Sequence, residues 1–194
     1  AALRKNVQAA MALANTIRTT LGPKGLDKLL LDEEGRIQVT NDGVTVLEAA
    51  RVEHPTARMM ISSSSIQDKV ARDGTTSTLL IAAELLQNAW DLVAQGVHPT
   101  VIASGFRMAE FESQIFLEEI SRDLGSEEEM LQATRTALAG KGESSMQEKI
   151  SLLAVKAAAA IVTEEAGKIR ADPTLVKVLA NKGGQASDSF LVNG

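Results

Sequence analysis

The stretch Asp73-Gly74-Thr75-Thr76-Ser77-Thr78-Leu79-Leu80 decides the fold of this chain of 194 residues, because a glycine break there leads directly into a long apolar pattern. From Leu79 onward the apolar residues recur at spacings of three and four, which predicts a helix with one buried stripe. Gly96 is typical of the end of such a helix, since glycine readily adopts the left-handed conformation that closes the last turn. A second stripe begins at Leu3 and runs to Leu21, where Gly22-Pro23 stops the helix.

The remaining pattern predicts a mainly α fold with one small β-hairpin. The hairpin is indicated by apolar and alternating residues over 28–31 and 36–40, with a turn-like acidic segment ending at Gly35 between them. Ser126 and Glu129 have the spacing of a capping box, which predicts that a helix starts there. Further helices are expected over residues 44–51, 56–70, 100–120, 127–139 and 150–166, and a strand over 175–179.

The composition excludes several classes of protein. The chain has no cysteine, so a disulfide scaffold, a thiolate zinc site and a cysteine nucleophile are excluded, and a reducing cytoplasm is the expected location. Its formal net charge is −5, which is opposite to the basic footprint of a nucleic-acid-binding protein. No apolar run is long enough for a membrane span, so neither nucleic acid nor a membrane is an expected partner. The first residue is Ala rather than Met, so residue 1 is not expected to be the natural start of the gene product.

Three short loops carry glycine beside an acidic, basic or proline residue at a helix boundary: Leu21–Gly25, Asn41–Gly43 and Asp73–Ser77. The third loop is the most informative. A helix that begins Gly-Thr-Thr-Ser offers backbone N–H groups without intrahelical partners and a dipole that favours anions, which together suit a phosphate group. Asp73, directly before it, could hold Mg²⁺, which takes one or two carboxylates and keeps several waters. An ordinary helix cap is the alternative interpretation of the same residues.

The three loops, taken with two neighbouring motifs, resemble the signatures of the chaperonins. The segments that carry the resemblance are Thr20–Lys28, Val39–Thr45, Val52–Pro55 and Gln67–Thr76. They are more similar to the archaeal and eukaryotic-cytosolic type (group II, the thermosome and its relatives) than to the bacterial GroEL type. The similarity continues through Gly96–Thr100, Thr136–Gly142 and Lys182–Gly184, and so covers essentially the whole chain.

The resemblance implies a domain order and a function. It implies an equatorial ATP-binding domain over residues 1–123, the first pass of an intermediate domain over 124–187, and the start of an apical domain over 188–194. It also implies an ATPase that encapsulates and folds unfolded proteins, with like subunits assembled in a double ring in the cytoplasm. The family's water-positioning aspartate has no counterpart here, so this segment alone is expected to be an incomplete ATPase.

The resemblance also assigns roles to individual residues, with ATP and Mg²⁺ as the expected cofactors. Asp73 matches the Mg²⁺ ligand, and Asp42 matches a catalytic acid near the γ-phosphate. Lys141 resembles a lysine in a loop that senses the nucleotide. The residues expected to contact or wrap the nucleotide are Leu21, Gly22, Pro23, Gly43, Gly74, Thr75, Thr76 and Ser77.

One position departs from the family pattern, because Arg72 stands where the family usually has glycine. If that position needs a positive φ, arginine is strained there by on the order of 1 kcal/mol; otherwise its guanidinium could touch a phosphate. The substitution is compatible with a divergent lineage such as the archaeal-type chaperonins of some bacteria.

A different class of function stays open from the residues alone, namely a helical scaffold or interaction domain without nucleotide, in which the Gly-Asp loops are only caps and turns. The aromatic residues Trp90, Phe106, Phe111 and Phe116 fall at helical spacings and are expected in the core.

Overall fold

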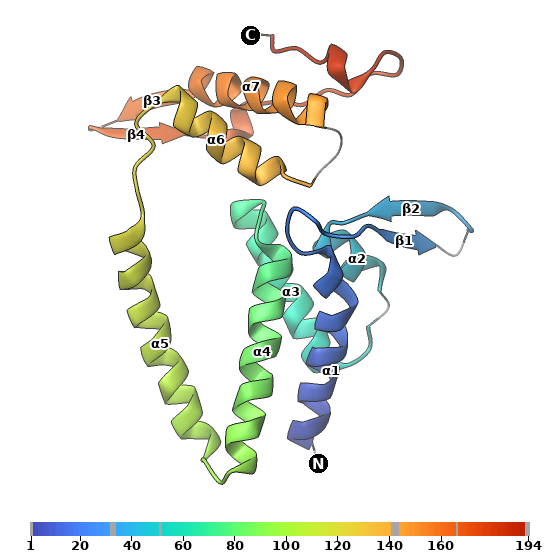
Figure 1. Cartoon of the computed structure of the whole chain (residues 1–194), viewed down its shortest axis with the longest axis vertical. Coiled ribbons are helices and arrows are strands. Elements are labelled where there is room, and N and C mark those ends of the chain that lie inside the picture. Colours follow the sequence, from blue (N-terminus) through green and yellow to red (C-terminus); the bar gives the residue numbers. More distant parts are fainter. Residues whose placement is uncertain (1, 32–33, 51, 141–143, 166, 193–194) are drawn as a thin grey trace. The chain divides into compact units, whose positions relative to one another are not determined.

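The computed structural model describes residues 2–31, 34–50, 52–140, 144–165 and 167–192. Over these residues it contains seven α-helices and two antiparallel two-stranded sheets, which confirms the predicted mainly α class (Figure 1). The chain divides into two compact units, Ala1–Ser121 and Arg122–Gly194. The assignment of equatorial, intermediate and apical domains to these residues stays a prediction.

The first unit is a helical bundle with one hairpin. In chain order its elements are α1 (Ala2–Ile17), the 3₁₀ turn η1 (Arg18–Thr20), β1 (Lys28–Leu31), β2 (Ile37–Thr40), α2 (Gly43–Ala49), α3 (Pro55–Ala71), α4 (Thr75–Ala94) and α5 (Pro99–Ile120). The long helix predicted after Gly74 is therefore α4, and it begins at Thr75 as expected. Helix α5 is capped by His98, whose Nδ1 accepts from the backbone N–H of Thr100, so the helix expected from residue 100 begins one residue earlier, at Pro99.

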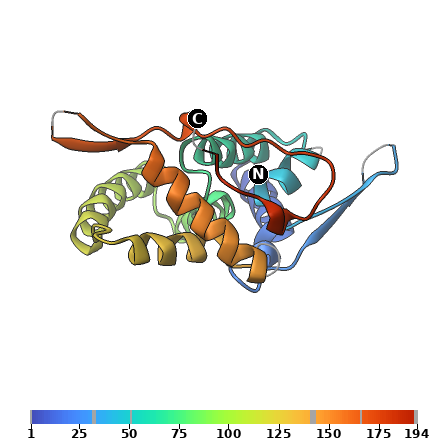
Figure 2. The same ribbon diagram turned by 90° about the horizontal axis from the view of Figure 1, so that it is seen from above.

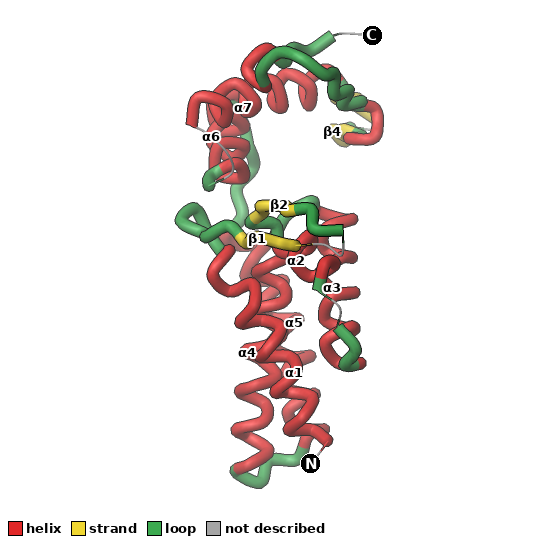
Figure 3. The backbone as a smooth tube through the Cα atoms, turned by 90° about the vertical axis from the view of Figure 1, so that its right-hand side faces the viewer, coloured by secondary structure: helices red, strands yellow, loops and turns green. Residues whose placement is uncertain are grey.

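The core of this unit is aliphatic and lies where α1, α2 and α3 meet α4. Helices α1 and α3 both pack along α4, and the three run side by side (Figures 1 and 3). The buried residues at this junction include Ile17, Leu47, Met60 and Leu79. The stripes predicted on the first helix and on α4 therefore form one common core, because each stripe covers the other from water.

Helix α5 does not bury the aromatic residues that were expected in the core. The exposed fractions are 37% for Phe106, 62% for Phe111 and 58% for Phe116, whereas Trp90 of α4 is half-buried. Helix α5 packs mainly on α4, near the turn that joins them, and diverges from it further along (Figure 1). Helical spacing places the three phenylalanines on α5, but it does not determine whether another element covers them.

The hairpin of β1 and β2 confirms the predicted strand pair. Lys28 pairs with Thr40 and Leu31 pairs with Ile37, so the strands are antiparallel and in full register. The hairpin extends away from the helices of its unit (Figure 2). The chain passes from β2 directly into the cap of α2. The hairpin therefore connects the first predicted loop to the second.

The second unit consists of α6 (Glu127–Leu138), α7 (Ser144–Ala160), β3 (Val162–Glu165), β4 (Lys168–Ala171), and two 3₁₀ turns, η2 (Pro173–Leu175) and η3 (Ala186–Asp188). The capping box before α6 is confirmed, because Ser126 Oγ accepts from the Glu129 N–H at 3.2 Å and Glu129 Oε2 accepts from the Ser126 N–H at 3.1 Å. Helices α6 and α7 pack on each other and are joined by Arg135, whose Nε and Nη2 donate to the two oxygens of Glu148 at 2.8 and 2.6 Å.

Two predictions in this unit are wrong. The helix expected to continue to residue 166 ends at Ala160, and residues Val162–Glu165 instead pair with Lys168–Ala171 as a second hairpin. β-branched residues 161–163 favour a strand, and Gly167, with φ of 74°, closes the turn. The strand expected over 175–179 is not formed, because η2 takes up Leu175 and residues 176–181 have no regular structure. No helix among the described residues has the length and apolar character to cross a membrane.

Candidate functional site

The loop between α3 and α4 contains two residues with left-handed backbone, separated by Asp73. Arg72 ends α3 with φ of 55°, and Gly74 precedes α4 with φ of 75°. Gly74 is the N-cap of α4 and has no side chain with which to cap it. The first backbone N–H groups of α4 therefore have neither an intrahelical partner nor a side-chain cap from the N-cap residue, which is the arrangement that suits an anion.

The conformation of Arg72 decides between the two interpretations of its departure from the family pattern. Because φ is 55°, arginine occupies a region that glycine adopts more easily, and the strained interpretation holds. Its guanidinium Nη1 lies 3.4 Å from Asp68 Oδ2, one turn earlier in α3. The side chain of Arg72 is 80% exposed, so this ion pair contributes little to stability.

Asp73 lies between the two left-handed residues, and its carboxylate is exposed. Its Oδ1 accepts from the backbone N–H of Gly74 at 2.8 Å, so the side chain folds over the start of α4. No group of three or more His, Cys, Asp or Glu residues that could hold a metal occurs in the described part of the chain. A lone exposed carboxylate fits Mg²⁺ that is bound mainly through phosphates and water, not a metal enclosed by protein ligands.

Asp42 caps helix α2. Its Oδ2 accepts from the backbone N–H of Thr45 at 2.9 Å and from the Thr45 hydroxyl at 2.6 Å. The backbone N–H of Asp42 in turn donates to Thr40 Oγ1 at 3.1 Å, at the end of β2. These bonds hold the exposed carboxylate of Asp42 at the point where the hairpin enters α2.

Gly43 brings the second and third loops together. It is buried as the first residue of α2, and a Cβ added to it would lie only 2.3 Å from Oγ1 of Thr76 in α4. Glycine is thus favoured at position 43 by this close approach, not by a positive φ. Asp42 directly precedes Gly43, and Asp73 lies three residues before Thr76. The contact between Gly43 and Thr76 therefore places both acidic loops at the start of α4.

The first loop is exposed and attached to a different part of the same helix. The turn η1 packs on α4, and an ion pair joins Arg18 of η1 to Glu84 of α4. Gly22 has φ of 83°, and its carbonyl accepts from the N–H of Gly25 at 2.9 Å, which closes a tight turn around Pro23. Leu21 is 49% exposed. The loop is thus anchored to α4, but through contacts distinct from those that join the second and third loops.

The remaining predicted site residues differ in accessibility. Thr75 is buried, with 8% of its surface exposed, and Thr76 and Ser77 are half-buried in the first turn of α4. Lys141 lies outside the described residues, so its predicted role stays a prediction.

Two side chains of α3 hold the third loop, and neither belongs to the predicted site residues. Ser64, which is 1% exposed, donates its hydroxyl to the carbonyl of Thr75 at 3.0 Å. Gln67 donates from Nε2 to the carbonyl of Asp73 at 3.1 Å. Their spacing of three residues on a helix was the available signal, since it places both on one face. Nothing in the sequence indicated that this face meets the loop.

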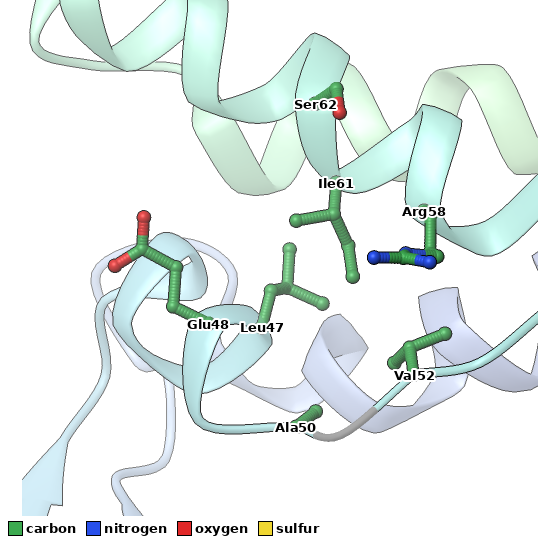
Figure 4. A pocket seen from close by; sticks show the side chains of 7 residues that line it. All are labelled: Leu47, Glu48, Ala50, Val52, Arg58, Ile61 and Ser62. Atoms are coloured by element: carbon green, nitrogen blue, oxygen red, sulfur yellow. The ribbon is translucent and has the colours of Figure 1, made fainter.

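A cavity of about 230 Å³ lies between α2 and α3 (Figure 4). Leu47 and Ile61 face each other across it, and Arg58 lies at its side. The residues that line it are Leu47, Glu48, Ala50, Val52, Arg58, Ile61 and Ser62. It contains none of the predicted site residues, so the candidate site is the exposed junction of the two acidic loops, not this cavity.

Comparison with known proteins gives concordant results. A family model described as the TCP-1/cpn60 chaperonin family matches residues 13–194. The chain is 43% identical over 195 aligned residues to a thermosome subunit of Methanopyrus kandleri, and 43% identical to one of Methanocaldococcus jannaschii. It is 40% identical to the thermosome subunit beta of Thermoplasma acidophilum. Each alignment covers 100% of this chain and 36% of the relative, so the chain spans about a third of the length of the curated relatives that it matches.

Proposed function

This chain belongs to the TCP-1/cpn60 chaperonin family, and we propose that it forms the nucleotide-binding part of an ATP-driven chaperonin subunit of the archaeal type. The observation that carries the proposal is the contact of Gly43 with Thr76, which joins two acidic loops at the uncapped start of a long helix. A phosphate chain with its metal needs such a combination of backbone N–H donors and carboxylates.

The proposed roles follow from what each group offers. The first N–H groups of α4 bind phosphate oxygens, with Gly74, Thr75, Thr76 and Ser77 forming the wall of the site. Asp73 binds Mg²⁺ through its exposed carboxylate, and Asp42 accepts a proton from, or orients, the attacking water. When held by Asp73, Mg²⁺ would supply positive charge that offsets the negative charge developing on the phosphates.

Outside these two loops, Leu21, Gly22 and Pro23 contact the nucleotide, and Lys141 senses its terminal phosphate. The residues belong to an equatorial domain over 1–123 and an intermediate domain over 124–187, followed by the start of an apical domain. In the complete protein, ATP turnover drives the encapsulation and folding of unfolded proteins in the cytoplasm, by a double ring of like subunits.

The test is a pair of isosteric substitutions in the full-length protein, Asp73→Asn and Asp42→Asn. Asparagine keeps an oxygen that can accept from Gly74 or from Thr45, so the local backbone is retained while the charge is lost. We expect each variant to melt within about 2 °C of the wild type and to lose at least about a hundredfold in ATP turnover, equivalent to roughly 3 kcal/mol of transition-state stabilisation.

Asp91→Asn is the matched control, because Asp91 is an exposed aspartate inside α4 whose carboxylate accepts from a side chain of its own helix, Gln87. Its turnover should equal that of the wild type. Normal turnover in Asp73→Asn would show that the carboxylate is not the metal ligand.

The competing function is a helical scaffold without nucleotide, and a melting experiment distinguishes the two. A ligand at a hundred times its Kd stabilises the folded state by about 2.7 kcal/mol, so ATP with Mg²⁺ should raise Tm measurably. An unchanged Tm at millimolar Mg²⁺ and ATP would favour the scaffold.

A further inference from the structure

Two side chains of α3 contact the candidate site, and both form hydrogen bonds with its main chain. Ser64 and Gln67 lie three residues apart, on the face of α3 that meets the start of α4. Both donate to main-chain carbonyl groups of the loop, at Thr75 and at Asp73 respectively.

The Ser64 bond is a tertiary tether. A serine inside a helix ordinarily donates to the carbonyl four residues earlier in the same helix, as the neighbouring Ser63 does to Met59 at 3.1 Å. The buried hydroxyl of Ser64 instead donates to a carbonyl of the next helix, α4. Because a buried hydroxyl that loses its partner is destabilising, this bond holds the first residue of α4 against α3.

The two bonds determine the direction of two peptide groups. In a trans peptide the C=O and the following N–H point in opposite directions, and no cis peptide occurs in the described chain. Gln67 draws the Asp73 carbonyl toward α3, so the N–H of Gly74 points away from α3. In the same way, Ser64 holds the Thr75 carbonyl, so the N–H of Thr76 points away from Ser64.

The carboxylate of Asp73 is oriented by the same device. Its Oδ1 accepts from the N–H of Gly74, which points away from Gln67, so the carboxylate lies on the side of the peptide opposite Gln67. Gly74 permits this arrangement because its φ is 75°, and a Cβ there would lie 3.4 Å from Nε2 of Gln67. Gln67 thus determines the orientation of both the peptide between Asp73 and Gly74 and the carboxylate of Asp73.

We propose that Ser64 and Gln67 are positioning residues: Ser64 aims the N–H of Thr76 at the phosphates of the bound nucleotide, and Gln67, through the Gly74 N–H that holds Asp73, aims the Asp73 carboxylate at its metal. The inference rests on the proposed function for the identity of the ligand. It adds that the affinity for phosphate depends on two residues that themselves make no contact with nucleotide.

The test measures binding of Mg²⁺ with a non-hydrolysable ATP analogue, and separately of adenosine, to the full-length protein. The variants are Ser64→Ala, which removes the hydroxyl, and Gln67→Met, which keeps the length of the side chain and removes its donor. The matched controls are Ser63→Ala and Gln114→Met, because Ser63 and Gln114 are exposed and bond only within their own helices.

We expect Ser64→Ala and Gln67→Met each to raise the Kd of the ATP analogue at least about fivefold, and to leave the Kd of adenosine within twofold of the wild type. The tethered loop is proposed to bind the phosphates and their metal, which adenosine lacks. The two controls should bind both ligands as the wild type does. Gln67 is only half-buried, so Gln67→Met keeps the test valid if Ser64→Ala unfolds the protein.

The possible failures are distinguishable. If the wild type binds the ATP analogue but both variants bind it with unchanged Kd, the positioning role is overturned and the proposed function stands. If the variants lose affinity for adenosine and for the ATP analogue in parallel, the two residues only stabilise the fold, and the inference is wrong. If the wild type binds neither ligand, the proposed function itself fails.

Discussion

Replacing Gly43 by alanine would introduce a methyl group where α2 meets the start of α4. The added Cβ would lie 2.3 Å from Thr76 Oγ1, which is about 1 Å shorter than the roughly 3.5 Å of an optimal non-bonded contact. Inserting a methyl group into such a contact costs about 1–3 kcal/mol. Alanine in a helix regains about 1 kcal/mol relative to glycine, so we expect Gly43→Ala to be destabilised by up to about 2 kcal/mol.

The structure offers a matched control for this substitution. Gly105 lies inside α5, and a Cβ added there meets nothing within 4 Å. Gly105→Ala should therefore be more stable than the wild type by about 0.5–1 kcal/mol. The two variants make the same chemical change in a helix, so their difference isolates the contact with α4.

A double-mutant cycle identifies the atom responsible. Thr76→Ala removes Oγ1, and the nearest atoms to the new Cβ are then Cβ and Cα of residue 76, at 3.4 and 3.5 Å. In that background Gly43→Ala should cost little, which gives a coupling energy of about 1–3 kcal/mol between the two positions.

The assay is urea unfolding followed by the fluorescence of Trp90, which is the only tryptophan of the chain and lies half-buried in α4. Additive free energies of unfolding for Gly43→Ala and Thr76→Ala would refute the contact. So would a Gly43→Ala variant that is as stable as Gly105→Ala. Either result would remove the observation on which the proposed nucleotide site depends.

The remaining predictions concern local features outside that contact. Arg72→Gly should raise the free energy of unfolding by about 1 kcal/mol and keep ATP turnover, because glycine adopts φ of 55° without strain; a lower stability would show that the arginine side chain contributes more than its conformation costs. The Arg135 guanidinium lowers the pKa of Glu148 through its two hydrogen bonds, so this pair stabilises the fold above the ordinary glutamate pKa and ceases to do so as the pH falls through the lowered value. Glu148→Gln should therefore flatten the acid limb of a plot of stability against pH, and an unchanged acid limb would contradict the linkage. Ser126→Ala should cost about 1 kcal/mol by removing the cap that pairs with Glu129, measurable as reduced amide protection in the first turn of α6, and protection equal to the wild type would refute it.

Features that depend on a few neighbouring residues could be predicted from the sequence. The start of α4 at Thr75 follows from the glycine break directly before it, and the capping box at Ser126 follows from side chains within one helical turn. The hairpin of β1 and β2 was equally readable, because alternation and a glycine-containing turn are local signals. The family resemblance rests on motifs of the same kind, and it named both acidic loops as parts of one site.

Local signals predicted the wrong structure where strand pairing outweighed helix propensity. Ala157–Ala160 favours a helix, and the prediction extended it to residue 166. Residues 162–165 instead bond across to Lys168–Ala171, since the hairpin satisfies their backbone groups and suits β-branched side chains. The prediction that the phenylalanines of α5 lie in the core was wrong for a different reason. Helical spacing places Phe106, Phe111 and Phe116 on the helix, but it does not determine whether another element covers them.

The sequence by itself determined the identities of the acidic and glycine-rich loops, the helices that they border and the family to which the chain belongs. Only the tertiary structure decided that Gly43 touches Thr76, that Ser64 and Gln67 bond to the backbone of the next helix, and that Arg72 is left-handed. The contact joins positions more than thirty residues apart in the sequence. Propensity and capping act within one turn of a helix, whereas such contacts depend on how α2, α3 and α4 bury their apolar stripes against one another, and that packing depends on all the helices at once.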